Sequence, residues 1–138
     1  EIELTENETC INIDYIQSAL AQIRKLGVSL AIDDFGTGMS SLAYLSALRV
    51  NVLKIDRTFI CDLTTNKGHR AIIAAAVTLS QSFGCDMVAE GVETQEQARM
   101  LYDMGCRAAQ GFLFARPMPA EAFHDLLTQQ QPQFSNAF

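Results

Sequence analysis

Two adjacent aspartates, Asp33 and Asp34, follow an apolar run and precede a turn with two glycines, Gly36 and Gly38. Comparable polar residues stand near the carboxyl ends of four other apolar segments: Glu3, Lys54, Glu90 and Gln110. Three carboxylates with a fourth beside them cannot all ionise in one crevice unless cations offset them, and one lysine is too little. Oxygen ligands of this kind favour hard divalent ions, so the pattern predicts a Mg²⁺ or Mn²⁺ site. A pair of such ions could clamp a phosphate, activate a water and stabilise the leaving oxygen.

Each of these residues also has a simpler structural interpretation. A single aspartate at a strand end is more often a helix cap or a turn residue, and only the five equivalent positions together favour function. Asp56 and Arg57 could form a surface ion pair that contributes little to stability. The G-x-G turn weakly suggests a dinucleotide site, but no third glycine follows at the fingerprint spacing. We interpret Lys54 as a phosphate ligand and Glu90 as a metal ligand or general base.

Five short apolar segments are predicted to be strands: Ile2–Thr5, Val28–Asp33, Val52–Ile55, Met87–Glu90 and Ala109–Leu113. Helical segments separate them, and a parallel return needs such a crossover, so the predicted class is α/β with parallel strands. The carboxyl ends of parallel strands lie at one edge, where α/β proteins build their sites. Five strands are fewer than the eight of a closed barrel.

Apolar residues at helical spacing, together with end signals, predict the helices between the strands. Glycines end the first two, a capping box begins the third, and proline suits the first turn of the last. The predicted helices are a short one after Ser40 and the longer segments Tyr15–Leu26, Arg70–Phe83, Thr94–Gly105 and Pro119–Leu127. One domain is therefore predicted over residues 1–128, and the polar tail 129–138 is expected to be frayed.

The composition favours a single soluble domain. Sixteen acidic against ten basic residues give a formal charge of −6, which disfavours binding to a nucleic-acid polymer. No apolar run reaches the roughly 18 residues of a membrane span, so a cytoplasmic location is expected, with any membrane anchor in upstream segments. The four widely spaced cysteines are expected to be free and mostly buried. The two histidines, His69 and His124, are expected to be surface residues without partners.

The order of the motifs resembles that of one known family. The successive motifs of EAL domains are similar to five stretches of this sequence: ELTE at 3–6, DDFGTGMSSL at 33–42, LKID at 53–56, AEGVET at 89–94 and QGFLFARPM at 110–118. EAL domains are bacterial phosphodiesterases that cleave the second messenger cyclic di-GMP to the linear dinucleotide pGpG. Their fold is a modified (β/α)8 barrel with one antiparallel strand. The resemblance implies that this chain is the carboxyl-terminal part of such a TIM-type barrel.

The resemblance also implies a role for each matching residue. The matches to ligands of a two-metal site are Glu3, Asp33, Asp34 and Glu90, with Asp33 as the bridging ligand. Glu90 also matches a glutamate required for catalysis, and Lys54 a lysine that assists the attacking water or the phosphate. The matches to substrate-binding or supporting residues are Asp56, Glu93 and Gln110, and Glu6 matches a glutamate that holds the loop after Asp34.

The loop 35–41 resembles one implicated in dimerisation and in coupling an upstream sensor or cyclase domain to activity. Met39 stands in this loop where the family often has tyrosine. The EAL tripeptide with its metal-binding glutamate, and the asparagine ligand that precedes ELTE, are absent from the 138 residues. We therefore expect a segment of a longer, active enzyme, which in isolation exposes sheet edges and lacks part of its metal ligands.

Three functional hypotheses follow. The first is a metal-dependent phosphodiesterase that acts on cyclic di-GMP. The alternative is a receptor that binds cyclic di-GMP without cleaving it and passes the signal to a partner. The third is a folded interaction module that binds neither metal nor nucleotide.

Overall fold

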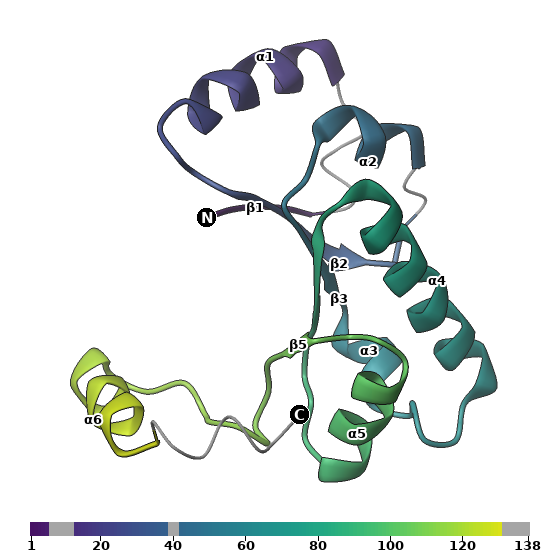
Figure 1. The fold of residues 1–138 in the computed structure, drawn as a ribbon, viewed down its shortest axis with the longest axis vertical. Helices are drawn as coiled ribbons and strands as arrows, with labels where there is room; N and C mark the ends of the chain where they lie inside the picture. The colour runs from purple at the N-terminus through teal and green to yellow at the C-terminus, as the bar shows by residue number, and fades with distance from the viewer. Residues whose placement is uncertain (6–12, 39–41, 131–138) are drawn as a thin grey trace.

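The computed structural model describes residues 1–5, 13–38 and 42–130. Within these ranges five strands form one parallel sheet in which each strand pairs with the next along the chain (Figure 1). The strands are β1 (Ile2–Thr5), β2 (Leu30–Phe35), β3 (Val52–Ile55), β4 (Asp86–Ala89) and β5 (Ala108–Ala109). This arrangement confirms the predicted α/β class and leaves β1 and β5 at the two edges of the described sheet.

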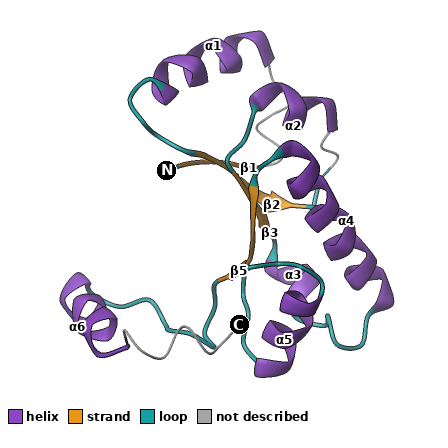
Figure 2. Cartoon of the chain, in the orientation of Figure 1, coloured by secondary structure: helices purple, strands orange, loops and turns teal. Residues whose placement is uncertain are grey.

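Helices connect the strands and follow the last of them (Figure 2). They are α1 (Ile13–Arg24), α2 (Leu42–Leu48), α3 (Arg57–Ile60), α4 (Lys67–Phe83), α5 (Gln95–Asp103) and α6 (Ala120–Gln130). Figure 1 shows α4 and α5 alongside the sheet, whereas α6 lies away from it at the end of an extended segment. Helix α6 continues beyond the predicted end at Leu127, so the first residues of the expected tail are helical.

Local caps explain two helix starts that the sequence did not predict. Helix α4 begins three residues before the predicted Arg70, because the Asn66 side chain accepts hydrogen bonds from the backbone N–H groups of Gly68 and His69. Helix α3 is an additional helix, and Asp56 caps it by accepting from Thr58 N at 2.9 Å. A helix of four residues is too short to produce an apolar periodicity, so it leaves no signal of that kind in the sequence.

The core lies between the central strands and the helices packed against them. The side chains of Ile32, Leu53 and Ile55 are fully buried, and Ile73 of α4 and Leu101 of α5 belong to the same cluster. Successive side chains of a strand point to opposite faces. Lys54, between Leu53 and Ile55, therefore points away from the core helices, although it is only 8% exposed.

Three strands have different bounds from those predicted, and one of them, β4, begins and ends one residue before the predicted Met87–Glu90. Strand β2 begins at Leu30 and continues to Phe35, two residues beyond the predicted end, and its register with β3 shifts between Ile32 and Phe35. Strand β5 is only two residues long because the chain turns at Gly111. There φ is +158°, and an added Cβ would lie 2.1 Å from the Val92 carbonyl oxygen.

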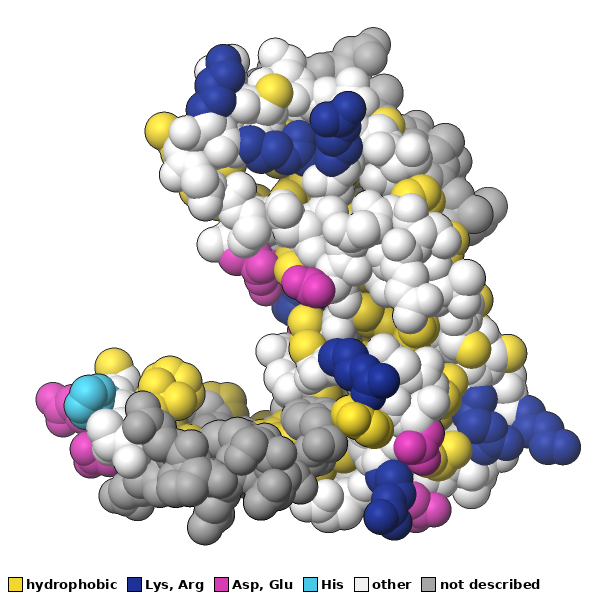
Figure 3. Space-filling view, viewed as in Figure 1, with side chains coloured by type: hydrophobic (Ala, Val, Ile, Leu, Met, Phe, Trp, Pro, Cys, Tyr) yellow, Lys and Arg dark blue, Asp and Glu magenta, His cyan; other side chains and the backbone are white. Residues whose placement is uncertain are grey.

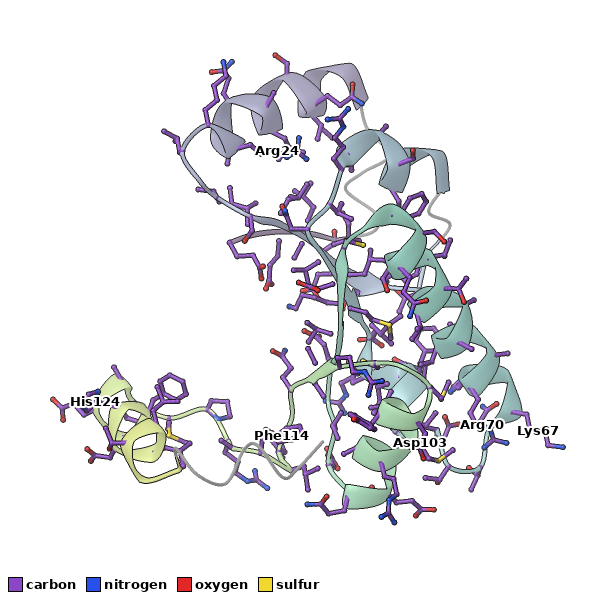
Figure 4. The ribbon with its side chains drawn as sticks, in the orientation of Figure 1. Arg24, Lys67, Arg70, Asp103, Phe114 and His124 are labelled. Atoms are coloured by element: carbon purple, nitrogen blue, oxygen red, sulfur yellow. The ribbon has the colours of Figure 1, made fainter. Side chains whose placement is uncertain are left out.

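Side chains of α1 cap the carboxyl end of α2. Arg24 points toward α2 (Figure 4), and its guanidinium donates hydrogen bonds to the carbonyl oxygens of Leu48 and Arg49. Gln17 Nε2 donates to the Ala47 oxygen at 3.1 Å. These bonds satisfy carbonyl groups that a helix end leaves without an intrahelical partner.

The histidine and cysteine predictions are only partly correct. His69 is not without a partner, because its Nδ1 pairs with the Asp62 carboxylate and its ring packs edge-on against Phe59. The free cysteines within the described residues range from exposed to buried: Cys61, Cys85 and Cys106. Cys10 lies outside the described residues.

None of the helices in the described ranges has both the length and the apolar character needed to cross a membrane.

Candidate active site

Lys54 on β3 is the centre of a cluster of charged side chains from four strand ends. Its Nζ lies 2.9 Å from Glu3 Oε1 on β1, 3.2 Å from Asp33 Oδ1 on β2 and 2.8 Å from Glu90 Oε1 directly after β4. These residues share one face of neighbouring strands but do not lie at equivalent positions, because Glu3 is level with Val52, two residues before Lys54, and Lys54 is level with Val88, two residues before Glu90. The structure thus brings four of the five predicted residues together around the long side chain of Lys54, whereas the common register predicted for them is wrong.

The pKa of the Lys54 ammonium is raised above its ordinary value. Burial opposes the charge on Lys54, but the hydrogen bonds to Glu90, Glu3 and Asp33 outweigh it. Lys54 is therefore a cation throughout the neutral range. Such a group is suited to bind an anionic phosphate and is unsuited to accept a proton from water.

The Glu90 carboxylate contacts both the Lys54 ammonium and the side-chain amide of Gln110. Burial raises the pKa of its carboxyl, the Lys54 ammonium lowers it, and the charges of Asp33 and Glu3 raise it again, so that the net change is upward. Gln110, after β5, donates from Nε2 to Glu90 Oε1 at 2.7 Å. A carboxylate with a raised pKa is a better proton acceptor near neutral pH than an ordinary glutamate.

The two adjacent aspartates point to different surroundings because the backbone turns sharply at Asp34. Asp34 has φ +55°, its N–H donates to Asp33 Oδ1 at 3.0 Å, and its carbonyl accepts from Thr37. Asp33 contacts Lys54, whereas Asp34 lines a pocket beside the cluster. Burial, then the charges of Asp33 and Asp56, raise the pKa of the Asp34 carboxyl.

Asp56 is a helix cap. This is one of the two structural interpretations that the sequence allowed, the other being a surface ion pair with Arg57. Burial opposes its ionisation, but hydrogen bonds from the Thr58 side chain and backbone hold the pKa of its carboxyl below the usual value. Asp56 therefore caps α3 as an anion and at the same time lines the pocket. Glu93 also lines the pocket, whereas Glu6 and residues 39–41 lie outside the described residues.

The pocket has a volume of about 630 Å³ and lies between the strand ends and the segment before and within α6. The predicted site residues that line it are Asp34, Asp56, Glu90, Glu93 and Gln110. Figure 3 shows the molecule hollowed between the sheet and α6, with acidic side chains gathered near the sheet. The volume is within the range typical of small-molecule sites.

Other residues that were not predicted as site residues also line this pocket, and among them Arg57, Phe112 and Arg116 offer positive charge or an aromatic face. The Arg116 guanidinium lies over the Phe112 ring, 4.4 Å from its centroid. Phe112 and Arg116 lie within the QGFLFARPM motif, and this motif could have indicated that they belong to the site. Arg57 follows Asp56 directly, and no periodicity distinguishes it from a surface residue.

The four predicted metal ligands do not converge on one point. Within residues 1–5, 13–38 and 42–130, no group of three or more His, Cys, Asp or Glu side chains has the arrangement of a metal centre. Lys54 lies among Glu3, Asp33 and Glu90, and Asp34 faces the pocket. The donor chemistry nevertheless fits a hard divalent ion, because carboxylate oxygens predominate and one ammonium group cannot offset them.

A parallel α/β sheet with a polar cluster toward its carboxyl edge is typical of α/β proteins with a site at that edge. The family model of the EAL domain matches residues 1–117, so the chain belongs to the EAL domain family. Its five parallel strands are part of a TIM barrel, as the similarity to solved EAL domains indicates.

Two curated relatives are from Pseudomonas aeruginosa. The cyclic di-GMP phosphodiesterase NbdA is 45% identical over 127 residues, which are 92% of this chain and 16% of NbdA. The bifunctional diguanylate cyclase/cyclic di-GMP phosphodiesterase MucR is 46% identical over 120 residues, which are 87% of this chain and 18% of MucR. The chain thus spans less than a fifth of either relative.

Solved structures have the same fold. The PaMucR phosphodiesterase in complex with c-di-GMP superimposes with a TM-score of 0.83 at 45% identity, covering 88% of this chain and 49% of that one. Klebsiella pneumoniae BlrP1, in a complex with manganese and cyclic di-GMP, has a TM-score of 0.78 at 40% identity and covers 84% of this chain and 30% of that one.

Proposed function

We propose that this chain contributes part of the active site of a phosphodiesterase that hydrolyses cyclic di-GMP to linear pGpG. The observation that carries the proposal is the cluster in which Lys54 lies within 3.2 Å of Glu3, Asp33 and Glu90, next to a pocket of about 630 Å³. The names of NbdA and MucR, both cyclic di-GMP phosphodiesterases, support the choice of substrate.

The carboxylates would hold Mg²⁺ or Mn²⁺ through Glu3, Asp33, Asp34 and Glu90, and the manganese in the BlrP1 complex supports this choice of ion. A bound divalent ion supplies Lewis-acid polarisation of the phosphate and activation of a water. Lys54 binds the phosphate as a cation. Glu90 accepts the proton of the attacking water, and Gln110 keeps the Glu90 carboxylate in place through the 2.7 Å hydrogen bond.

The pocket would bind the nucleotide beside this cluster. Phe112 offers an aromatic face to a guanine base, and Arg57 and Arg116 offer positive charge to a phosphate or to a base edge. Asp34, Asp56 and Glu93 supply acceptors for the N–H groups of guanine or for a metal ion. Aromatic and cationic groups opposite carboxylates suit a substrate that has both planar bases and charged phosphates.

The proposed partners follow from the same family membership. The loop 35–41, of which residues 35–38 are described, would contact a second copy of the chain. The double activity in the name of MucR supports a cyclase or sensor domain on the same polypeptide, and we propose that the domain works in the cytoplasm.

The test is a hydrolysis assay on the full-length gene product with cyclic di-GMP and Mg²⁺ or Mn²⁺, in which chromatography separates pGpG from substrate. Turnover is expected with either ion and is expected to stop with a chelator. Asp33→Asn should abolish turnover, whereas Asp103→Asn, at the end of α5, should leave it unchanged. Full turnover by Asp33→Asn would contradict the assigned roles.

A receptor that binds cyclic di-GMP without cleaving it is the second candidate. The observation that favours it is the absence, among the described residues, of a group of carboxylates arranged as a metal centre. Calorimetry distinguishes the two candidates, because a receptor binds cyclic di-GMP with a chelator present and forms no pGpG when metal is added.

A further inference from the structure

Two adjacent segments of the chain supply much of the pocket wall. The segment after β3 contributes Asp56 and Arg57, and the segment after β4 contributes Glu90, Gly91 and Glu93. Neither segment belongs to a strand, so the sheet ladder alone does not fix one relative to the other. The relative position of these segments decides whether their side chains face one substrate.

Gln97 joins the two segments through hydrogen bonds of its side chain. It is the third residue of α5, and only 7% of it is exposed. Its Oε1 accepts hydrogen bonds from Glu93 N at 2.9 Å and Thr94 N at 3.0 Å. Its Nε2 donates to the carbonyl oxygens of Ile60 at 3.0 Å and Cys61 at 3.4 Å, at the end of α3.

The hydrogen bonds of Gln97 go beyond helix capping. The capping box with Thr94 accounts for the bond to Thr94 N and for Gln97 N donating to Thr94 Oγ1 at 3.2 Å. The two Nε2 bonds reach residues 36 and 37 positions away and contribute nothing to α5 itself. An amide side chain has two acceptor lone pairs and two N–H donors, and here all four are in use. Glutamate lacks the donors and methionine lacks both, although each has a similar length.

A second contact joins the same two segments. Gly91 has φ +71°, and a Cβ at this position would lie 2.5 Å from Arg57 Cβ. The Glu90 N–H also donates to the Ile55 carbonyl oxygen at 3.1 Å, directly before Asp56. The two segments are thus in close contact at Gly91 and Glu90, and the hydrogen bonds of Gln97 join them at a second place.

We propose that Gln97 is a positioning residue for the reaction: it fixes the segment that carries Glu90 and Glu93 relative to the segment that carries Asp56 and Arg57. Gln97 itself does not line the pocket. Its effect on turnover rests on the proposed phosphodiesterase function, whereas its effect on the two segments does not.

The test compares three variants of the full-length gene product. Gln97→Met removes all four side-chain hydrogen bonds, and Gln97→Glu keeps the acceptor for Glu93 N and Thr94 N but loses both donors to α3. The matched control is Thr94→Val, which removes the cap of the same helix but leaves the bonds to Ile60 and Cys61 in place. Each variant is measured for kcat, KM, folded fraction and backbone amide hydrogen exchange.

Both Gln97 variants are expected to lower kcat about tenfold per folded molecule, with a smaller change in KM, because misplaced catalytic groups slow the chemical step. Thr94→Val should keep kcat within about twofold, since it alters only the helix cap. Amide exchange in residues 57–61 should rise in the Gln97 variants and not in Thr94→Val. Equal kcat losses in Gln97→Glu and Thr94→Val would overturn the proposal.

A measurement on the unaltered protein covers the case in which the Gln97 variants do not fold. The backbone amides of Cys61 and Val92 are both hydrogen-bonded, so their hydrogen exchange reports the opening of the two segments. If the segments are held together, the exchange rates of both amides should depend on denaturant concentration in the same way. Separate openings would overturn the proposal. If the two amides open together but the protein does not hydrolyse cyclic di-GMP, the result contradicts the phosphodiesterase function and leaves the role of Gln97 in joining the segments intact.

Discussion

The Lys54 Nζ lies 2.8 Å from Glu90 Oε1 and joins the third and fourth strands on the pocket side of the sheet. Lys54→Met removes this ion pair and leaves Glu3, Asp33 and Glu90 as neighbouring carboxylates without their cation. We expect the free energy of unfolding at pH 7, measured in urea with a chelator present, to fall by about 2 kcal/mol. The decrease is below that of a fully buried pair because the Glu3 side chain is 47% exposed.

The pH dependence of this stabilisation follows from the direction of the pKa shift. The pKa of Lys54 is raised on folding, so the contribution is fully present below the ordinary lysine value of 10.5 and is lost as pH rises through the folded pKa. The difference between the unaltered protein and Lys54→Met should therefore persist through neutral pH and shrink in alkali, and it should also shrink in acid, where the partner carboxylates become protonated. Lys67→Met, at the exposed start of α4, is the control and should change stability little. A constant difference up to strongly alkaline pH would contradict the assignment.

Glu90 provides the second prediction. Its carboxyl should titrate above the ordinary glutamate value of 4.5 in the metal-free protein, because burial and the charges of Asp33 and Glu3 outweigh Lys54. The Lys54→Met substitution should raise the pKa of Glu90 further, since Lys54 favours the ionised form. Carbon-detected NMR of the glutamate carboxyls against pH, with Glu90→Gln to assign the resonance, measures both values. A pKa of Glu90 that does not change in Lys54→Met would refute the coupling.

Gln110 provides the third prediction, because its Nε2 is 2.7 Å from Glu90 Oε1 while the rest of the residue is exposed. Gln110→Ala should lower kcat roughly tenfold, the scale typical of residues that orient a catalytic group, and should leave the thermal midpoint nearly unchanged. Gln95→Ala, an exposed residue on α5 outside the pocket, is the control. If Gln110→Ala and Gln95→Ala had the same activity, Gln110 would have no role in catalysis.

The sequence predicted the elements whose signal is local. The bounds of β1 and β3 are as expected because alternating or apolar residues stop at Thr5 and Ile55, and the capping box of α5 was predicted by its spacing. That the site residues share one face of the sheet was predictable because strand residues alternate between two faces, whereas their different levels along the strands were not. The positive φ of Asp34 was not predicted, because only a few per cent of non-glycine residues adopt it and the enrichment of aspartate there is a weak signal.

The remaining features depend on contacts between distant residues. The Nε2 bonds of Gln97 cross 36 and 37 residues, and no pattern around Gln97 indicates them. The role of Arg57 as a pocket residue depends on where α3 begins, and the close approach of Gly91 depends on where Arg57 lies. Sequence patterns thus indicated which residues carry the chemistry, whereas the tertiary contacts show how their segments are held together.

Asp56 provides the fourth prediction, because it has two effects that different substitutions separate. It caps α3 by accepting from Thr58 N at 2.9 Å, and its charge raises the pKa of Asp34. Asparagine is as good a cap as aspartate, whereas alanine cannot cap. We therefore expect Asp56→Ala to lower the free energy of unfolding by about 1 kcal/mol and Asp56→Asn to change it much less, as measured in urea.

The pKa of Asp34 should instead fall in both variants, because each removes the neighbouring negative charge. NMR titration of the Asp34 carboxyl in the metal-free protein measures this change, with Asp86→Asn, an exposed residue at the start of β4, as the control. Stability should therefore distinguish alanine from asparagine at position 56, while the pKa of Asp34 should not. If both substitutions destabilised the protein equally, the side chain of Asp56 would stabilise α3 through its charge rather than through the hydrogen bond to Thr58.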